Sequence, residues 1–277
     1  MASKKVWFVT GCSHGMGNAL VRKLLEEGYS VAATSRKAES LMAEFGEESS
    51  KFLPLAMNLK DENDVRRAVS EAKEKFGRID VVVNNAGFTH LATIEETSDR
   101  AAHDLFDVNV FGLLNVLRSV LPVMRWQKSG HIFNVSSLGA YNVGPLSGLY
   151  CATKHAVKAI SETLAQEVRG FGIHVTDVKP GFIRTQFFGQ SFKTTTEENS
   201  PYRKLYEDNM KFYMGQNGTQ AGDPAKVAEL YINVAEMEHP YESLPMGTDS
   251  CDGIREIAAN TVKLMDEMRN VAATTNF

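Results

Sequence analysis

A chain of 277 residues exceeds an average domain, but one α/β sheet of that size still buries a single core, so we expect one domain spanning residues 1–277. With 43% hydrophobic and 23% charged residues, the composition is that of an ordinary globular protein. The net charge of −4 comes from interspersed acids and bases, with no basic stripe of the kind that binds nucleic-acid phosphates. Nucleic acid is therefore not an expected partner.

The three cysteines, Cys12, Cys151 and Cys251, are widely spaced and contain no CxxC pair. This pattern fits neither a disulfide framework nor a zinc site, so we expect no metal and a reducing, cytoplasmic location. The apolar stretch at Val6–Val9 is too short for the core of a signal peptide. No run approaches the roughly 18 apolar residues of a spanning helix, so no membrane span is expected.

Six apolar runs bounded by turn residues predict strands that are buried on both faces of a parallel sheet. They are residues 6–9, 30–34, 52–57, 79–83, 131–135 and 173–178. Segments with helical spacing lie between them, and Gly28, Gly77 and Gly172 stand where left-handed caps would end three helices. This alternation predicts a doubly wound sheet, whose ligands bind beyond the carboxyl ends of the strands.

The regular alternation ends after residue 178. Residues 186–222 form a long, mixed segment rich in aromatic side chains, and Pro224 then opens another helix. Irregular segments of this length inside a compact domain are usually functional. We therefore expect a small helical lid over the substrate here, within the same domain.

A glycine-rich turn, residues 10–17, follows the first strand directly and precedes a helix. Gly11 allows a tight turn, Gly15 lets backbone N–H groups approach a pyrophosphate, and Gly17 permits close helix packing. The helix N-terminus favours negative charge at the same place. A purely structural turn is the alternative, but the position between strand and helix favours a dinucleotide site.

Tyr150 and Lys154 are four residues apart in a segment with helical spacing, which places both on one face. A free tyrosine, with a pKa of ~10, holds its proton too tightly to transfer it readily in both directions near neutral pH. A neighbouring lysine ammonium stabilises tyrosinate and lowers that pKa. The pair therefore predicts a general acid/base, although a lone Tyr-x-x-x-Lys also arises often by chance.

The motifs and their order resemble the short-chain dehydrogenase/reductase family. The resemblance extends to about Thr185, through the Thr-Gly-x-x-x-Gly-x-Gly turn, the Asn84-Asn85-Ala86-Gly87 tetrad, the Tyr-Lys pair and the Pro180-Gly181 element. It implies a Rossmann-type sheet of about seven parallel strands. It also implies a nicotinamide-dependent oxidoreductase that acts on a carbonyl or alcohol.

The resemblance assigns two further catalytic residues, Ser137 and Asn109. Ser137 stands thirteen residues before Tyr150, the spacing of the family's serine, which hydrogen-bonds the substrate oxygen; Ser136 is the rival. Asn109 matches the asparagine that supports a water linking the lysine to solvent. A satisfied buried hydrogen-bonding group is the alternative for any one of these residues, but four in order favour the catalytic interpretation.

The expected cofactor contacts come from five places along the chain. They are Gly11, Ser13, His14, Gly15, Met16 and Gly17; Ser35 and Arg36; Asn58 and Leu59; Asn85, Ala86 and Gly87, with Tyr150 and Lys154; and Pro180, Gly181, Ile183 and Thr185. Asn58 departs from the aspartate that the family usually has, but an amide oxygen still accepts a bond from adenine. His14 is either a donor to the cofactor or, more simply, a solvent-facing loop residue.

The end of the second strand predicts which cofactor is preferred. A site for NAD(H) would place an acid there to bind the adenosine ribose, whereas this chain has Ser35 followed by Arg36. Serine leaves room for a 2′-phosphate, and a guanidinium binds phosphate in a bidentate manner. We therefore expect NADP(H) to be favoured over NAD(H).

The segments beside the motifs predict an apolar small-molecule substrate, contacted by Ser137, Tyr150, Tyr141, Val143 and Phe187. The resemblance further implies a homodimer or homotetramer formed through helices at about residues 103–126 and 150–170. A catalytically idle NADP(H)-binding regulatory module is the alternative function, and turnover of any carbonyl compound would exclude it.

Overall fold

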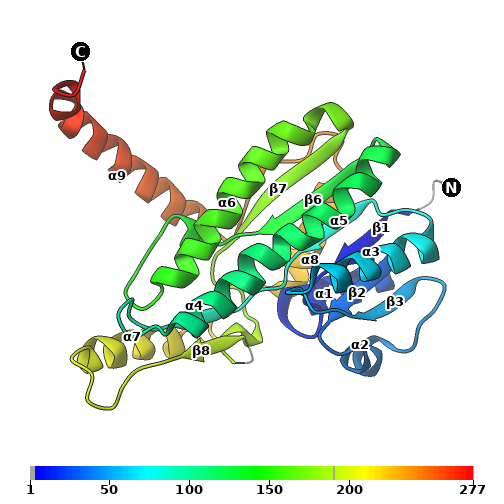
Figure 1. Cartoon of the computed structure of the whole chain (residues 1–277), viewed down its shortest axis with the longest axis horizontal. Coiled ribbons are helices and arrows are strands. Elements are labelled where there is room, and N and C mark those ends of the chain that lie inside the picture. Colours follow the sequence, from blue (N-terminus) through cyan, green and yellow to red (C-terminus); the bar gives the residue numbers. More distant parts are fainter. Residues whose placement is uncertain (1–3, 190, 277) are drawn as a thin grey trace.

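The architecture is built on a seven-stranded parallel sheet in the order β3-β2-β1-β4-β6-β7-β9 (Figure 1). The computed structural model describes residues 4–189 and 191–276. Its strands are β1 (Val6–Val9), β2 (Ser30–Ser35), β3 (Phe52–Ala56), β4 (Val81–Asn84), β6 (Gly130–Val135), β7 (Ile173–Pro180) and β9 (Ser243–Met246). The strand order reverses between β1 and β4, so the expected doubly wound sheet is confirmed.

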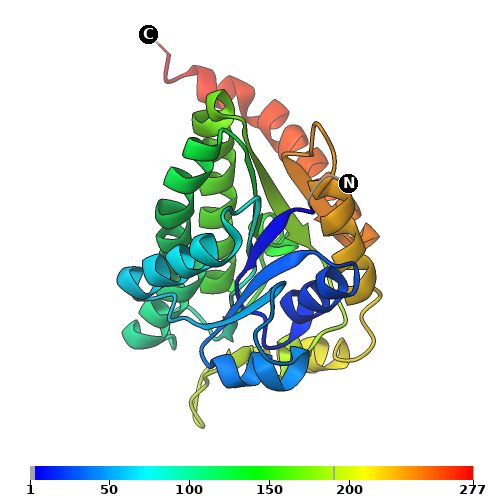
Figure 2. The same ribbon diagram turned by 90° about the vertical axis from the view of Figure 1, so that its right-hand side faces the viewer.

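Helices cover both faces of this sheet (Figure 2). The α-helices of the described chain are α1 (Gly15–Glu26), α2 (Ala38–Phe45), α3 (Glu62–Phe76), α4 (Asp99–Phe106), α5 (Gly112–Gln127), α6 (Gly148–Val168), α7 (Arg203–Gly215), α8 (Pro224–Ala235) and α9 (Thr248–Ala273). Successive strand residues point to opposite faces. Trp7 and Val9 therefore pack with α1 and α8, while Phe8 between them packs with α3, α5 and α6.

The three glycines that were expected to end helices do so in the left-handed conformation. Gly28, Gly77 and Gly172 have φ of 76°, 78° and 70°. At Gly172 a Cβ would also lie 2.5 Å from the Lys128 carbonyl oxygen, so the turn into β7 excludes any other residue.

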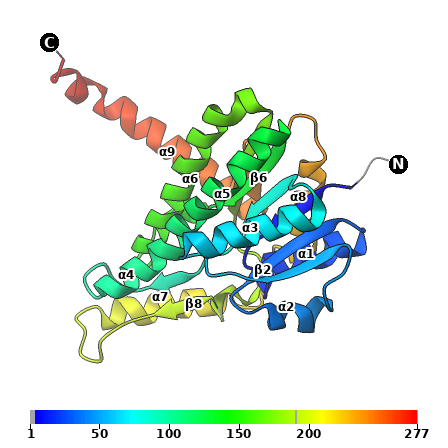
Figure 3. The ribbon, with the colours of Figure 1, turned by 45° about the vertical axis from the view of Figure 1, so that its right-hand side comes forward.

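Two parts of the sheet assembly were not located from the sequence. β9 is a four-residue edge strand that contains Pro245, and a proline is tolerated there because an edge strand lacks one partner. A second, two-stranded parallel sheet joins β5 (Thr89–Leu91) to β8 (Phe192–Thr194), so the segment after Thr185 is fastened beside the turn that follows β4. Figure 3 shows β8 and α7 below the main sheet.

The stretch Asp99–Gln127 is continuously helical through α4, the π-helical turn η1 (Asp107–Phe111) and α5. In the described part of the chain it is the one helix long and apolar enough to cross a membrane. Its most apolar window is 44% buried inside the fold. Leu113, Val116 and Val120 belong to the core beside α3, which accounts for much of its apolar character.

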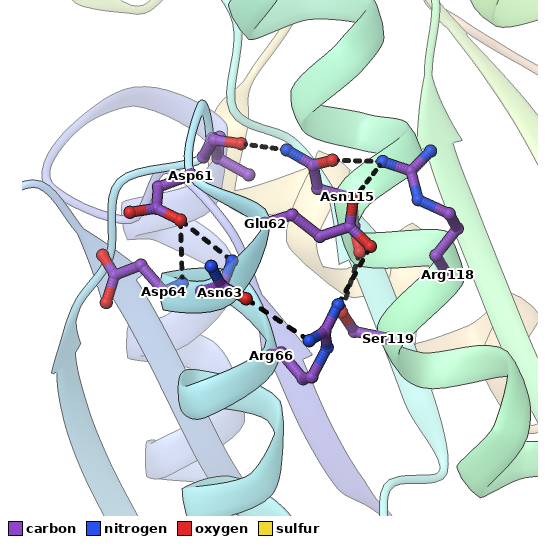
Figure 4. A network of polar contacts seen from close by, with 9 residues as sticks. Asp61, Glu62, Asn63, Asp64, Arg66, Asn115, Arg118 and Ser119 are labelled. Atoms are coloured by element: carbon purple, nitrogen blue, oxygen red, sulfur yellow. Dashed lines mark hydrogen bonds and ion pairs between the residues drawn. The ribbon is translucent and has the colours of Figure 1, made fainter.

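A polar network joins the start of α3 to α5 (Figure 4). The Glu62 carboxylate accepts bonds from Arg66 at 3.2 Å and from Arg118 at 2.9 Å. Asn115 donates to the Leu59 carbonyl at 2.8 Å. The loop that carries Asn58 and Leu59 is therefore held in place at the carboxyl end of β3.

Candidate functional site

One cavity of about 750 Å³ lies at the carboxyl ends of the strands, where the order of the sheet reverses. Its wall includes the glycine-rich turn after β1, the end of β2 and the tetrad after β4. The same wall continues to Ser137, Tyr150 and Lys154. The fold therefore brings the expected proton-transfer residues and all the expected cofactor residues except Gly17 into one space.

The glycines of the turn after β1 allow neighbouring segments to approach one another closely. Gly11 has φ of 71°, and a Cβ there would lie 2.7 Å from the Ala86 Cα, so the close approach of two loops needs glycine. A Cβ on Gly17 would lie 2.5 Å from the Asn85 side-chain nitrogen, so Gly17 serves packing and does not line the cavity. Ser13, Gly15 and Met16 face the cavity at the start of α1, where free N–H groups favour anions.

His14 is half-buried and bridges two segments. One ring nitrogen is 2.9 Å from the Ser13 hydroxyl, and the other is 2.8 Å from the hydroxyl of Ser191, just before β8. Burial, with a contribution from Arg36, lowers the pKa of His14, so the ring is neutral near pH 7. The simpler expectation of a solvent-facing histidine is therefore wrong, because the segment before β8 folds over the turn.

The end of β2 presents a hydroxyl and a free cation to the cavity. The Ser35 hydroxyl donates to the Lys37 carbonyl at 2.6 Å and lies 3.1 Å from the Ser40 hydroxyl, so it shapes the turn into α2. Arg36 is exposed and lines the cavity, and no carboxylate among the described residues pairs with it. Its guanidinium is available to a ligand.

Asn58 and Leu59 line the cavity beside this end of the sheet. The Asn58 side-chain oxygen accepts a bond from the Lys60 backbone N–H at 3.1 Å. The oxygen that was expected to meet adenine therefore has a partner already, although an amide oxygen has a second lone pair.

The tetrad at the end of β4 is hydrogen-bonded to the start of the glycine turn. The Asn85 side-chain nitrogen donates to the Thr10 carbonyl at 2.9 Å, and the Ala86 N–H donates to the Thr10 hydroxyl at 3.0 Å. A Cβ on Gly87 would lie 3.2 Å from the Asn109 side-chain oxygen and 3.5 Å from Lys154 Nζ. Gly87 therefore leaves room for both side chains.

Ser137 and Tyr150 meet at the middle of the cavity. The expected lowering of the Tyr150 pKa by Lys154 is wrong: burial raises the pKa of Tyr150 to about 12, and a hydrogen bond with Ser137 opposes that rise. The Ser137 side chain also caps the turn Leu138–Ala140 by accepting the Gly139 N–H at 3.0 Å. The rival Ser136 is buried and donates to the Val178 carbonyl at 2.9 Å. The geometry therefore favours Ser137 for contact with a substrate oxygen.

Lys154 is buried and lies against the Tyr150 ring, with Nζ 5.7 Å from the ring centroid. It donates to the Val135 carbonyl at 2.8 Å. Burial lowers the pKa of Lys154 to about 8, and the negative charge of Asp177 opposes the fall. The Lys154 ammonium is therefore charged at neutral pH but loses its proton at slightly higher pH.

Asn109 does not line the cavity but supports its wall from the π-helical turn η1. Its side-chain nitrogen donates to the Phe88 carbonyl at 2.9 Å and to the Thr153 hydroxyl at 3.1 Å, and its oxygen accepts the Phe88 N–H at 3.1 Å. Single π-helical turns often occur at functional sites. Here the π-helical turn directs the Asn109 side chain toward Phe88 and Thr153.

A buried ion pair that sequence reasoning did not identify lies beneath the site. Asp177 and Lys179 of β7 are 1% and 4% exposed, with Lys179 Nζ 3.5 Å from an Asp177 carboxylate oxygen. Burial raises the pKa of Asp177, while Ser136 and Lys179 oppose the rise. The apolar pattern of the strand gave no signal for this pair, because a buried strand is expected to lack charges.

The element after β7 brings Pro180, Gly181, Ile183 and Thr185 to the cavity wall. A Cβ on Gly181 would lie 2.2 Å from an Asp249 carboxylate oxygen, and that same oxygen accepts the Phe182 N–H at 2.7 Å. The start of α9 therefore fixes this loop. Sequence reasoning did not expect this contact, because the C-terminal segment shows no motif.

The remaining end of the cavity is mainly apolar. Phe187 lies there with its ring centroid 6.1 Å from that of Tyr150. The other residues on this wall include Leu138, Pro145, Phe182, Asn209, Phe212 and Tyr213. Phe187 and the inward-facing residues of α7 therefore cover this end of the cavity.

Two expected substrate contacts are wrong. Tyr141 does not line the cavity, because its ring lies 4.9 Å from Lys179 Nζ and 5.3 Å from Lys158 Nζ on the other side of the turn Leu138–Ala140. Val143 is 62% exposed and also lies outside the cavity wall. Their neighbours Asn142 and Gly144 do line it, so the sequence located the loop but not the side chains that face inward.

Several cavity residues were not identified from the sequence, and two of them lie in or next to β8. Ser191 and Lys193, in and before β8, line the cavity, and Lys193 Nζ lies 4.7 Å from the Phe88 ring centroid. β8 has only three residues, too few for a periodic signal. Among the described residues, no group of three or more His, Cys, Asp or Glu side chains could hold a metal ion.

Comparisons with known proteins give one consistent result. The family model for short chain dehydrogenases matches residues 5–196. The oxidoreductase BOA17 of Botryotinia fuckeliana is 38% identical over 266 residues, which cover 95% of this chain and 96% of that protein. A crystallised short-chain dehydrogenase from Streptomyces avermitilis is 32% identical, with a TM-score of 0.88 and complete coverage of both chains.

Two similar structures at 25% identity contain nicotinamide cofactors. A 3-ketoacyl-(acyl-carrier-protein) reductase from Brucella melitensis is complexed with NADH; its TM-score is 0.73, with coverage of 88% of this chain and 96% of that one. A short chain dehydrogenase from Burkholderia cenocepacia is complexed with NADP; its TM-score is 0.74, with coverage of 96% and 98%. Proteins of this architecture thus bind either form of the cofactor.

Proposed function

Because this chain belongs to the short-chain dehydrogenase/reductase family, we propose that it is an NADP(H)-dependent oxidoreductase that interconverts a carbonyl and an alcohol on an apolar small molecule. The observation that carries the proposal is the single cavity shared by the glycine turn, Arg36 and the Ser137-Tyr150-Lys154 group. A dinucleotide that extends from Arg36 along the glycine turn would end beside Tyr150.

The residues present fit a dinucleotide. Gly11 and Gly15 adopt positive φ, and a Cβ on Gly15 would point toward Thr185 across the cavity. The start of α1 offers N–H groups to a diphosphate, and Ser13 adds a hydroxyl. Ile183 and Thr185 line the same cavity, and the family resemblance assigns them to the nicotinamide carboxamide.

The preference for NADP(H) rests on the end of β2. Ser35 brings no negative charge, and Arg36 is unpaired among the described residues. A hydrogen bond to a charged group contributes roughly 1.5–3 kcal/mol, or about 10- to 150-fold in affinity. Arg36 would therefore bind the 2′-phosphate of NADP(H) more strongly than the ribose hydroxyl of NAD(H).

The bound cofactor supplies or accepts the hydride, and the protein handles the proton. In the direction of reduction, the Tyr150 hydroxyl donates its proton to the substrate oxygen as negative charge develops there. The Ser137 hydroxyl donates a hydrogen bond to the same oxygen and stabilises that charge. The Lys154 ammonium, against the Tyr150 ring, stabilises the tyrosinate that results.

Asn109 is a positioning residue in this scheme. Its side chain holds the Phe88 backbone and Thr153, and so fixes the wall on which Lys154 rests. The family resemblance adds a water between Asn109 and the lysine, through which Tyr150 would regain its proton from solvent.

The substrate class follows from the cavity wall beyond Tyr150. Phe182, Phe187 and Phe212 supply aromatic surface there, and Asn142, Asn209 and Tyr213 supply neutral polar groups. The cavity also holds the charged side chains of Asp104 and of Lys193, whose Nζ lies 4.7 Å from the Phe88 ring centroid. A largely apolar carbonyl compound fits the aromatic part of this surface best.

We also propose that the chain forms a homodimer or homotetramer through α5 and α6. Phe111, Trp126 and Phe171 are 51%, 78% and 46% exposed on or beside these helices. Large aromatic side chains on one surface are enriched at interfaces.

The test of function is NADPH oxidation with a panel of ketones, aldehydes, steroids and quinones, repeated with NADH. We expect turnover of at least one apolar class, with kcat/KM for NADPH at least about tenfold above that for NADH. Tight NADPH binding without turnover of any compound would instead support an idle cofactor-binding module. Equal use of both cofactors would show that Arg36 does not meet the 2′-phosphate.

A further inference from the structure

The C-terminal helix α9 leaves the body of the protein after its first turns (Figures 1 and 3). Its start is anchored, because Asp249 accepts the Phe182 N–H and the buried Ser250 donates to the Lys179 carbonyl at 2.7 Å. Every residue from 258 to 276 is exposed. Nothing in the described chain covers the outer two-thirds of this helix.

The exposed part of α9 carries an apolar stripe with the spacing of a coiled coil. Steps of three and four residues alternate through Ile254, Ile257, Thr261, Leu264, Met268 and Val271. Thr261 is the one polar member of this series, and Ile254 and Ile257 are partly buried. Ala258, Met265 and Ala272 widen the stripe on one side. Leu264 and Val271 are 51% and 57% exposed. Isolated exposed apolar residues are common, but a continuous stripe of this kind marks a surface that binds something.

We propose that α9 pairs in antiparallel orientation with α9 of a second copy of this chain. The stripe is self-complementary about a two-fold axis between Val262 and Lys263. Ile254 then lies opposite Val271 of the second copy, Ile257 opposite Met268, and Thr261 opposite Leu264. Each position is covered by its counterpart, as an isologous contact requires. The antiparallel orientation also places the two bodies at opposite ends of the helix pair.

The charges on α9 agree with this partner and this register. Between residues 254 and 271 there are three basic and three acidic side chains, Arg255, Lys263, Arg269, Glu256, Asp266 and Glu267. A helix that binds an anionic lipid surface would carry an excess of basic residues on its polar face. In the antiparallel pair, Asn260 and Glu267 flank the stripe on the same side, so Asn260 lies near Glu267 of the second copy.

A shift of the pair by one heptad is disfavoured by coverage, because it would leave Ile254 and Ile257 without an apolar partner. The register centred between Val262 and Lys263 covers every position of the stripe.

The first test measures the mass of the full-length protein by sedimentation, in a variant with glutamates at two stripe positions, Leu264→Glu/Met268→Glu. We expect half the mass of the unmodified assembly, because a charge cannot be buried in the helix pair. The matched control, Ala259→Glu/Asn270→Glu, adds the same charge to the polar face and should keep the full mass. Unchanged NADPH affinity in both variants would show that the body is folded.

The second test measures orientation by disulfide formation in chains whose Cys251 is replaced by serine. A mixture of the Ile254→Cys and Val271→Cys chains should cross-link on mild oxidation. Neither chain should cross-link with itself, since two copies of residue 271 lie about 25 Å apart in the antiparallel pair. Cross-linking of Val271→Cys alone would overturn the antiparallel pairing.

Two further outcomes would contradict the proposal as a whole. Equal masses for the stripe variant and the unmodified protein would show that α9 joins no second copy. Co-sedimentation of the unmodified protein with neutral or anionic lipid vesicles, lost in the stripe variant, would show instead that the stripe binds a lipid surface.

Discussion

Tyr150 stands at the centre of the proposed chemistry, because it holds the proton that the substrate oxygen must gain or lose. Replacing it with phenylalanine removes that proton and little else. General acid catalysis contributes about 10²- to 10⁴-fold, so Tyr150→Phe should lower kcat by that order. The dissociation constant for NADPH, measured by fluorescence titration, should change little. Near-normal kcat would contradict the assignment.

The neighbouring residues Ser136 and Ser137 allow a matched test of which serine contacts the substrate oxygen. Ser137→Ala should lower kcat by a smaller factor than Tyr150→Phe, because it removes one hydrogen bond to the developing charge. Ser136→Ala should leave kcat unchanged, since that hydroxyl donates to the Val178 carbonyl inside the core. The opposite pattern would assign the role to Ser136.

Cofactor choice depends on two neighbouring residues at the end of β2. Ser35→Asp should reverse the preference toward NADH, because a carboxylate repels a 2′-phosphate and accepts a bond from a free ribose hydroxyl. Arg36→Ala should weaken NADPH binding selectively, and added salt should reduce the difference by screening the exposed guanidinium. Lys37→Ala, an exposed neighbour outside the cavity wall, is the matched control.

The buried charges beneath the site predict a pH dependence. Lys154, whose pKa is lowered to about 8, is charged below that pH and neutral above it, while Tyr150, with a pKa of about 12, keeps its proton. Carbonyl reduction should therefore slow as the pH rises through about 8. Asp177→Asn removes the negative charge that holds the pKa of Lys154 up, so the decline should begin at lower pH.

The groups around Asp177 allow a control for this pH shift. Lys179, Lys158 and Glu162 face the carboxylate, and the Tyr141 ring lies over both lysines. Glu162→Gln removes a negative charge near Asp177 without touching the cavity. It should leave the pH profile of kcat in place; an equal shift in both variants would mean that long-range charge, and not Asp177 itself, sets the profile.

At the scale of elements, α7 and the segment before it form the apolar wall of the substrate end. Phe212→Ala and Tyr213→Ala should raise KM and change the order of preferred substrates, because both side chains line the cavity. The dissociation constant for NADPH should stay nearly constant. Lys204→Ala, on the exposed face of α7 where it pairs with Asp208, should alter neither quantity. Loss of cofactor binding in the cavity variants would mark α7 as part of the core.

At the scale of the whole molecule, cofactor binding should stabilise the fold. The cavity is built from the ends of β1, β2, β4, β6 and β7, so a ligand there holds both halves of the sheet together. A ligand at 100 times its Kd adds about 2.7 kcal/mol to the free energy of unfolding. NADPH should therefore raise Tm more than the same concentration of NADH. Equal shifts would contradict the preference expected from Arg36.

Local features of the sequence were sufficient to locate most strands of the sheet. Unbroken apolar runs located six strands, and the glycines at 28, 77 and 172 marked turns that need positive φ. The spacing of Tyr150 and Lys154 placed both on one face of α6, since helical geometry alone decides that. These signals depend on the chain near each residue, so the sequence determined them by itself.

Contacts between distant segments were decided only by the tertiary structure. β9 and β8 are too short for a periodic pattern, and they exist because neighbouring strands offer them backbone partners. The ring of Tyr141 turned toward Lys179, away from the cavity, because a buried lysine lies behind it. His14 contacts the Ser191 hydroxyl and is half-buried, because the segment before β8 lies over the glycine turn. The positions of these side chains depend on residues that are distant in the sequence. The spacing of residues along the chain therefore does not predict them.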